Sequence, residues 1–298
     1  MEYQQLGTSD LKVSRIGFGA MSLKDDIDTN KKLIGRALEL GINYFDTADL
    51  YDKGENEKII GEALKEKRKE VIVATKVGNQ WRADGTGWDW NPRKDYILTS
   101  VENSLKRLST DYIDLYQLHG GTMQDNIDET IEAFEQLVEQ GKIRYYGISS
   151  IRPNVIKEYI KRSNIVSVMM QYSLLDRRPE ETCLPLLKEN NIGVLARGSV
   201  AQGLLVGKPA RTYLNHTAEE VRQAIAAVQN LSIERRTCAQ IAIQYVLHHP
   251  AIVSAVVGMR TISQLEEGVN ALNAPFLTEK ELQLLQQSAI ANHYEEHR

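Results

Sequence analysis

One pattern repeats along most of the 298 residues: a short apolar run, a loop, and then a segment with the apolar spacing of a helix. The apolar runs predict eight strands, at 16–19, 44–48, 71–77, 112–119, 144–149, 166–172, 193–197 and 254–258. The segments after or between them predict helices at 29–40, 55–67, 93–108, 127–140, 153–162, 180–190, 237–248 and 262–272. Strict alternation of strand and helix predicts parallel strands joined by right-handed crossovers.

Eight such units in a chain of this length favour a closed (β/α)8 TIM barrel over an open doubly wound sheet, which is the alternative. Residues 1–14 stand apart and predict a β-hairpin around the turn GTSD at 7–10. Two further helical segments, 218–230 and 278–291, have no strand of their own. We therefore expect one domain over 1–298, an α/β barrel with an N-terminal hairpin cap and two extra helices.

The composition excludes several classes of function. The chain has 36 Lys and Arg against 40 Asp and Glu, so it lacks the excess base of a nucleic-acid-binding protein. No apolar run approaches the length of about 18 residues that spans a membrane, and residues 1–20 lack the apolar core of a signal peptide. Cys183 and Cys238 are the only cysteines, which favours a reducing compartment. We expect a cytoplasmic enzyme.

Common cofactor and metal motifs are incomplete or missing. GFGAMS at 17–22 begins like a dinucleotide-binding GxGxxG loop but lacks the third glycine, so we interpret it as a tight turn. The sequence contains no GxxxxGK[ST], HExxH or GxSxG motif. Its six histidines have no metal-ligand spacing beyond one adjacent pair at 248–249, and we expect no metal site.

Ionisable residues follow three neighbouring strands. In a (β/α)8 barrel the chemistry lies at the C-terminal strand ends, where Asp46, Lys76 and His119 are found. Each shares a strand face with apolar neighbours, because side chains alternate along a strand. If those faces point inward, the three residues converge at the barrel mouth. Tyr51 then lies over them, five residues beyond Asp46.

This set of side chains suits one kind of chemistry. An Asp and a Lys buried side by side stay ionised, because each offsets the desolvation of the other. A neighbouring ammonium favours the phenolate of a tyrosine, which makes the phenol a proton donor near neutral pH. A neutral histidine can orient a carbonyl oxygen by donating a hydrogen bond. Each residue alone also has a structural interpretation, but together they favour protonation of an oxygen as hydride reaches its carbon.

The motifs around these residues resemble the aldo-keto reductase family along essentially the whole chain. They are GINYFDTA at 41–48 with Tyr51, GENE at 54–57, VATK at 73–76, LKRL at 105–108, DYIDLYQLH at 111–119 and QGKIRYYGIS at 140–149. The sequence looks most similar to bacterial members of the branch that contains potassium-channel β-subunits. The resemblance implies an NADPH-dependent carbonyl reductase, with a small-molecule aldehyde or ketone as substrate. It assigns Tyr51 as general acid, Lys76 and Asp46 as the residues that tune it, and His119 as the residue that orients the substrate.

The same resemblance implies a set of NADPH contacts. It places the nicotinamide carboxamide on Ser149 and Gln171, and the nicotinamide ring on Tyr172. The remaining contacts lie near the last strand: Gly258, Arg260 and Gln264 around the 2′-phosphate, and Glu267 near the adenine. An arginine suits a phosphate because its planar guanidinium donates two parallel hydrogen bonds.

The chain departs from the family pattern at three places. Ser150 stands where the family usually has Asn, RGSV at 197–200 replaces Tyr-Ser-Pro-Leu, and Gly268 replaces the Asn near the adenine. These changes are expected to affect cofactor affinity and not the chemistry. Arg197 has two interpretations at this stage: it reaches the cofactor pyrophosphate, or it forms a salt bridge to a neighbouring loop.

All three tryptophans lie in the long loop after the third strand, as Trp81, Trp88 and Trp90. We expect them to form an apolar wall of the substrate pocket, the alternative being that some of them order the loop. In segment 202–217, Gly203 and Gly207 permit hinging and predict a mobile flap over the cofactor, the alternative being a disordered loop. An alternative function is an NADPH-binding redox sensor or partner-binding module with slow turnover, and a lyase or isomerase on the same barrel is a more distant one. The physiological substrate and the oligomeric state stay open.

Overall fold

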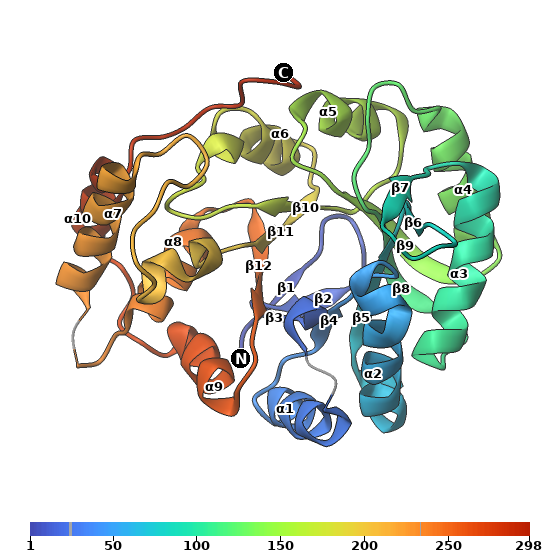
Figure 1. Cartoon of the computed structure of the whole chain (residues 1–298), viewed down its shortest axis with the longest axis horizontal. Coiled ribbons are helices and arrows are strands. Elements are labelled where there is room, and N and C mark those ends of the chain that lie inside the picture. Colours follow the sequence, from blue (N-terminus) through green and yellow to red (C-terminus); the bar gives the residue numbers. More distant parts are fainter. Residues whose placement is uncertain (24–25, 233) are drawn as a thin grey trace.

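The fold is a closed barrel of eight parallel strands surrounded by helices (Figure 1). The computed structural model describes residues 1–23, 26–232 and 234–298. Around the barrel the strands follow the order β10-β11-β12-β3-β4-β5-β8-β9. Their bounds are β3 Ile16–Gly19, β4 Tyr44–Asp46, β5 Ile72–Val77, β8 Ile113–Leu118, β9 Ile143–Ser149, β10 Ser167–Gln171, β11 Gly193–Arg197 and β12 Ile252–Gly258. The predicted (β/α)8 barrel is confirmed, and closure of the sheet excludes the open doubly wound alternative.

Helices follow each barrel strand, with two additions near the C-terminus. The helices that alternate with strands are α1 Ile27–Glu39, α2 Glu55–Leu64, α3 Lys94–Leu108, α4 Ile127–Glu139, α5 Pro153–Arg162, α6 Cys183–Glu189, α8 Cys238–His248 and α9 Ile262–Val269. The additions are α7 Ala218–Leu231 and α10 Glu279–Ser288, which lie side by side outside the ring (Figure 1). Both begin with a capping box, from Thr217 and Thr278, which satisfies backbone donors of the first turn.

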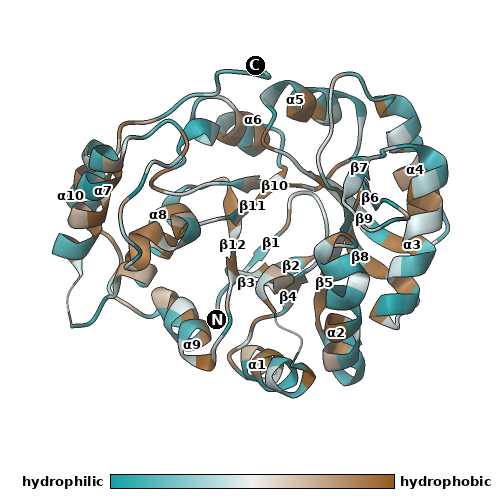
Figure 2. Cartoon of the chain, in the orientation of Figure 1, coloured by the Kyte–Doolittle hydropathy of each residue, from teal (hydrophilic) through white to brown (hydrophobic). Residues whose placement is uncertain are grey.

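The core has two layers. The larger lies between the strands and the helices, and Figure 2 shows that the apolar sides of the helices face inward while polar sides face out. The smaller fills the barrel and includes Tyr44, Leu115 and Leu195. Strands β1 Tyr3–Gln5 and β2 Lys12–Ser14 form the predicted N-terminal hairpin. Its side chains Leu6, Leu11 and Val13 are buried in the inner layer, so the hairpin closes the barrel end opposite the C-terminal strand ends.

The loop after β5 contains a short hairpin that the sequence did not predict. Strands β6 Asn79–Trp81 and β7 Trp88–Trp90 pair antiparallel, with Trp81 opposite Trp88. Arg82 and Asp89 form a salt bridge across it, with nitrogen–oxygen distances of 2.6–3.1 Å. Three-residue strands are too short for an alternating apolar pattern, so the sequence showed only a long loop.

Helix packing gives a direct test of the fold, because two helical glycines have opposite surroundings. A Cβ on Gly61 of α2 would lie 2.5 Å from backbone atoms of Leu108 in α3, whereas a Cβ on Gly35 of α1 meets nothing within 4 Å. We expect Gly61→Ala to destabilise the protein by about 2 kcal/mol or more, because the two helices must separate. We expect Gly35→Ala to stabilise it by about 0.5–1 kcal/mol through helix propensity. Chemical denaturation measures both, and equal effects of the two changes would contradict this packing.

Candidate active site

Side-chain alternation brings one residue from every barrel strand to the open mouth. Tyr44, Ala74, Leu115, Met169 and Leu195 belong to the inner layer, so residues two further along each strand face the same way. The resulting ring is Gly19, Asp46, Lys76, Gln117, Ser149, Gln171, Arg197 and Gly258. We define these eight residues as the mouth ring. It lies at the C-terminal strand ends, where barrels of this type place their chemistry.

The centre of the mouth is a buried ion pair. Lys76 Nζ lies 2.5 Å from Asp46 Oδ1, and both side chains are almost inaccessible to solvent. Burial alone would lower the pKa of Lys76, but the charge of Asp46 and the neighbouring Tyr51 hold that pKa above its ordinary value. Burial raises the pKa of Asp46, and Lys76 opposes that rise. The ammonium therefore stays charged, as a buried lysine does only beside a compensating carboxylate.

Tyr51 is held against this pair by an unusual turn. The residues after it, Asp52 and Lys53, have φ values of 48° and 53°, and Gly54 has φ 89°. The turn places the Tyr51 hydroxyl oxygen 3.5 Å from Lys76 Nζ and the ring centroid 5.0 Å from the same atom. Since Lys76 donates to the hydroxyl oxygen, the hydroxyl hydrogen is free to be given to a substrate.

His119 completes the group of four. Its ring meets the Tyr51 ring edge to face at 5.8 Å between centroids. Burial, with further contributions from Lys76 and Arg197, lowers the pKa of His119 to about 3. The imidazole is therefore neutral at physiological pH and has one N–H to donate. Its Nδ1 is shielded from solvent and has no hydrogen-bond partner among the described residues.

A supporting network that the sequence analysis did not assign lies behind these residues. Gln117 donates to the second oxygen of Asp46 at 3.3 Å. Glu57, fully buried, accepts from Thr75 Oγ1 and from Arg107 Nε, both at 2.6 Å. The Arg107 side chain also lies where a Cβ on Gly54 would be. This network joins the strand of Lys76 to the turn of Tyr51. The sequence could have indicated both Glu57 and Gln117, because Glu57 lies in the GENE motif and Gln117 lies two residues before His119.

The two residues expected to hold the carboxamide lie on neighbouring strands of the barrel, with Ser149 paired to Met169, two residues before Gln171. Ser149 is half-buried at the end of β9, next to β10 in the barrel. The Gln171 amide is already oriented: its Nε2 donates to Asp176 Oδ2 at 2.8 Å and to the Tyr213 hydroxyl at 3.1 Å. Its Oε1 accepts from Arg197 at 3.0 Å.

The stacking role expected of Tyr172 is wrong for this structure. Val168 and Met170 of β10 face the outer layer, and Tyr172, on the same face, belongs to that layer too. It is 2% exposed, its hydroxyl donates to Glu180 at 2.8 Å, and its ring packs near Tyr245. The ring therefore has no free face at the barrel mouth.

Arg197 lies on the mouth ring itself. It is exposed, it shares the face of Leu195, and its hydrogen-bond partner is the neutral amide of Gln171. Within the described parts of the chain it forms no ion pair, so the salt-bridge interpretation is wrong. Gly198, beside it, has φ +77° and no room for a larger residue without displacing Gln171, which explains glycine at this departure from the family pattern.

The positions expected to hold the 2′-phosphate and adenine lie beyond β12. Arg260 and Gln264 are exposed, and the guanidinium of Arg260 has no partner among the described residues. The Gln264 side chain accepts from the Arg260 backbone N–H at 3.0 Å, which fixes the entry into α9. Gly258 is exposed between this segment and the loop after β3, and Glu267 is half-buried one turn into α9. The segment therefore presents a cation with no partner among the described residues beside an exposed glycine.

The other two departures from the family pattern, Ser150 and Gly268, contact other parts of this chain. The Ser150 hydroxyl accepts from the Arg152 backbone N–H at 3.2 Å, so it closes the turn into α5. Gly268 is buried, and a Cβ there would lie 3.7 Å from Met259. Gly268 has no side chain to offer a ligand, and the Ser150 hydroxyl already accepts one hydrogen bond from the chain itself.

The three tryptophans have different surroundings. Trp81 Nε1 donates to the carbonyl of Leu50, which places this ring beside the Tyr51 turn. Trp88, opposite it on the hairpin, is 48% exposed. Trp90 packs over Gly78 and Gly120 and donates to Asp125 at 3.0 Å. Trp90 therefore orders the loop, while Trp81 and Trp88 stay candidates for the pocket wall.

Segment 202–217 is anchored at several points. Leu204, Leu205, Tyr213 and His216 in it are all at most 5% exposed, and Tyr213 accepts from Gln171 of the mouth ring. These anchors favour a fixed wall of the site over a hinged flap.

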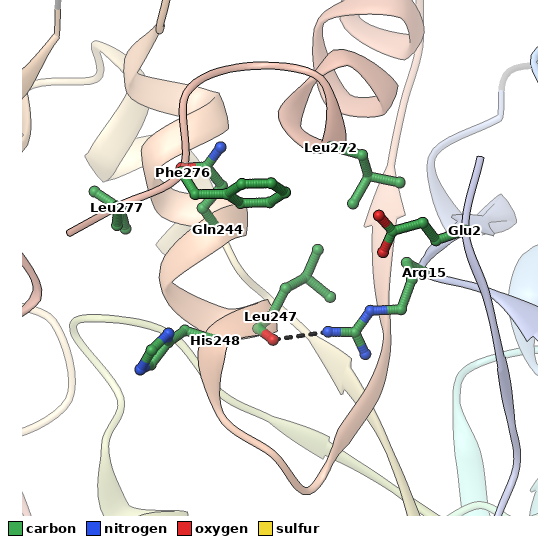
Figure 3. A pocket seen from close by; sticks show the side chains of 8 residues that line it. All are labelled: Glu2, Arg15, Gln244, Leu247, His248, Leu272, Phe276 and Leu277. Atoms are coloured by element: carbon green, nitrogen blue, oxygen red, sulfur yellow. Dashed lines mark hydrogen bonds between the residues drawn. The ribbon is translucent and has the colours of Figure 1, made fainter. Parts of the chain in front are cut away.

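A cavity of about 190 Å³ lies at the other end of the barrel (Figure 3). It is lined by Glu2, Arg15, Gln244, Leu247, His248, Leu272, Phe276 and Leu277. Arg15 donates to the backbone carbonyls of Leu247 and Val253 at 2.7 and 2.9 Å. It therefore joins the end of α8 to the start of β12. The residues of the mouth ring are all at the opposite end.

The described residues show neither a metal-binding cluster nor a membrane-spanning helix. They contain no group of three or more His, Cys, Asp or Glu side chains placed to hold a metal ion. None of their helices combines the length and apolar character needed to cross a bilayer.

Comparison with known proteins gives consistent matches. The model of a family described as "Aldo/keto reductase family" matches residues 15–290. The chain is 52% identical to the "Uncharacterized oxidoreductase YqkF" of Bacillus subtilis over the full length of both. It is also 52% identical to the solved "aldo-keto reductase AKR11C1 from Bacillus halodurans (holo form)", with a TM-score of 0.94, covering 100% of this chain and 99% of the other. A more distant relative is the "NADH-specific methylglyoxal reductase" of Escherichia coli, 31% identical over 90% of this chain and 92% of the relative.

The pKa of His119 leads to a stability prediction. The folded pKa, about 3, lies below the ordinary value of 6.5, so the unfolded chain binds a proton that the folded chain does not. Stability from this group is complete above pH 6.5 and is lost as the pH falls toward 3. Between pH 7 and pH 5 we expect the wild type to lose about 1–2 kcal/mol more unfolding free energy than His119→Gln. Urea denaturation at both pH values measures the difference, and parallel losses in the two proteins would show that His119 titrates normally in the fold.

Proposed function

The chain belongs to the aldo/keto reductase family, and from that premise we propose that it is an NADPH-dependent carbonyl reductase in which Tyr51 is the general acid. Its substrates on this proposal are aldehydes or ketones, which it reduces to alcohols. The observation that carries the proposal is the single position where a hydroxyl, a compensated ammonium and a neutral imidazole meet: Tyr51, Lys76 and His119.

Each of these residues has a distinct task in the reduction. A bound reduced nicotinamide supplies the hydride for the carbonyl carbon. Tyr51 gives its hydroxyl proton to the carbonyl oxygen as negative charge develops there, and Lys76 stabilises the phenolate that remains. Asp46 keeps the Lys76 ammonium charged in a buried position. His119 donates its N–H to the same carbonyl oxygen and so orients the substrate.

The fit of the cofactor rests on features of this chain. The mouth ring presents an exposed glycine, Gly258 of β12, and a half-buried one, Gly19 of β3, and Arg260 after β12 has a guanidinium without a partner among the described residues. On this proposal Ser149 and Gln171 hold the carboxamide, Gln264 assists Arg260 at the 2′-phosphate, and Glu267 lies toward the adenine. A neutral NADH ribose offers Arg260 no such partner, so we propose a preference for NADPH. An NADH-specific relative shows that family membership alone does not decide this point.

The surroundings of the mouth support a shielded substrate site. Trp81 is fixed beside the Tyr51 turn by its bond to Leu50, and Trp88 lies across the hairpin from it. We propose that these two rings form the apolar wall against which the substrate lies. We further propose that residues 1–298 act as one barrel domain in the cytosol, a location supported by the free thiols of Cys183 and Cys238.

Replacing the proposed acid separates chemistry from binding. We expect Tyr51→Phe to lower kcat for aldehyde reduction by about 10²–10⁴-fold, because the ring stays and only the proton donor is lost. The dissociation constant for NADPH should change less than about twofold, since the proposed cofactor contacts remain. The measurements are steady-state kinetics on an aldehyde panel and calorimetric NADPH titration.

Tyr112→Phe is the matched control, because Tyr112 lies before β8 at the opposite end of the barrel, against Arg68. It should keep wild-type kcat. Retained turnover in Tyr51→Phe would refute the assigned acid. Tight NADPH binding by the wild type without reduction of any aldehyde would instead favour a redox-sensing role.

A further inference from the structure

Arg197 places an exposed, charged side chain on the mouth ring. It ends β11 between Gln171 of β10 and Val256 of β12, and faces the barrel interior with Leu195. It is exposed to any ligand bound at the mouth. Its charge reaches the central group, because it contributes to lowering the pKa of His119.

The protein fixes the direction of this side chain. Arg197 Nη1 donates to Gln171 Oε1, and the amide of Gln171 cannot turn over without losing its bonds to Asp176 and Tyr213. Asp176 is fully buried and is itself paired with Arg178 at 2.7 Å. The guanidinium is thus held over the mouth by a neutral acceptor.

The charges of the mouth do not cancel. Lys76 is neutralised by Asp46, and His119 is neutral at physiological pH. Arg197 has no carboxylate partner among the described residues, so the mouth retains one uncompensated positive charge. A ligand atom that comes to rest there meets that charge directly.

The proposed cofactor position brings the nicotinamide to this charge, and the inference therefore rests on the proposed function. The residues for its carboxamide, Ser149 and Gln171, lie on β9 and β10, whereas Arg260 lies beyond β12. Strand β11 lies between them in the barrel, so a cofactor spanning both ends crosses Arg197. For reduction the nicotinamide ring would have to lie near Tyr51 and His119, at the end of the barrel that carries Arg197.

We propose that Arg197 makes the site select the redox state of the cofactor, holding NADPH and repelling NADP⁺. The reduced nicotinamide ring is neutral, so a guanidinium beside it meets no like charge. The oxidised ring carries a positive charge that Arg197 opposes. Two like charges about 4 Å apart near a protein surface repel strongly enough to change a binding constant tenfold or more. The effect favours release of the oxidised cofactor after hydride transfer.

The test is a comparison of two dissociation constants in each protein. Isothermal titration with NADPH and with NADP⁺ at pH 7.5 gives the ratio of Kd for NADP⁺ to Kd for NADPH. We expect the wild type to bind NADPH at least about tenfold more tightly. We expect Arg197→Met to lower that ratio about tenfold, chiefly by improving NADP⁺ binding. Arg197→Lys keeps the charge and should keep most of the ratio.

Arg260→Met is the matched control. Both nucleotides carry the 2′-phosphate, so this change should weaken both by the same factor and leave the ratio unaltered. An unchanged ratio in Arg197→Met would overturn the inference. If the ratio is unchanged because both nucleotides bind more weakly by the same factor, Arg197 contacts a group that both share, such as the pyrophosphate. A wild type that binds neither nucleotide would instead remove the proposed function itself.

Discussion

The buried contact between Lys76 and Asp46 is the interaction on which the mouth depends. All three hydrogens of the Lys76 ammonium are directed to oxygens: Asp46 Oδ1, the carbonyl of Thr47 and the hydroxyl of Tyr51. An ammonium in such a position is tolerated only with a paired carboxylate, and the pair forms only if β4 and β5 lie side by side in register. Parallel pairing of β4 with β5 is therefore a condition of the chemistry.

Charge at the mouth is distributed so that each group has one defined protonation state. Lys76 is charged because Asp46 compensates it, and His119 is neutral because burial and two neighbouring cations oppose its protonation. Tyr51 lies where both can act on the same oxygen of a substrate. The network of Glu57, Thr75 and Arg107 joins the strand that carries Lys76 to the turn that carries Tyr51.

Two regularities made most of the fold and the central site predictable from the sequence. Alternation of strand and helix indicated the barrel, and two-residue alternation within strands brought Asp46, Lys76 and His119 to one end. The same alternation shows why Tyr172 was assigned wrongly: Met169 faces inward, so Gln171 does too, and Tyr172 must face the helices. Trp90 could not be separated from Trp81 by sequence, because its packing on Gly78 and Gly120 depends on a hairpin of three-residue strands. The exposed position of Arg197, whose hydrogen-bond partner is the Gln171 amide and not a carboxylate among the described residues, likewise depends on a contact between segments far apart in the chain.

The central claim is that the mouth ring and the segment after β12 bind NADPH. The most direct measurement is a titration of the wild-type protein with NADPH and, separately, with NADH, followed by the fluorescence of its three tryptophans, which lie in the loop beside the mouth. We expect saturable quenching by NADPH, and binding of NADH weaker by about tenfold or more, because a charge-assisted contact from Arg260 to the 2′-phosphate is lost. Absence of binding by either nucleotide, or equal affinity for both, would contradict this account of the site.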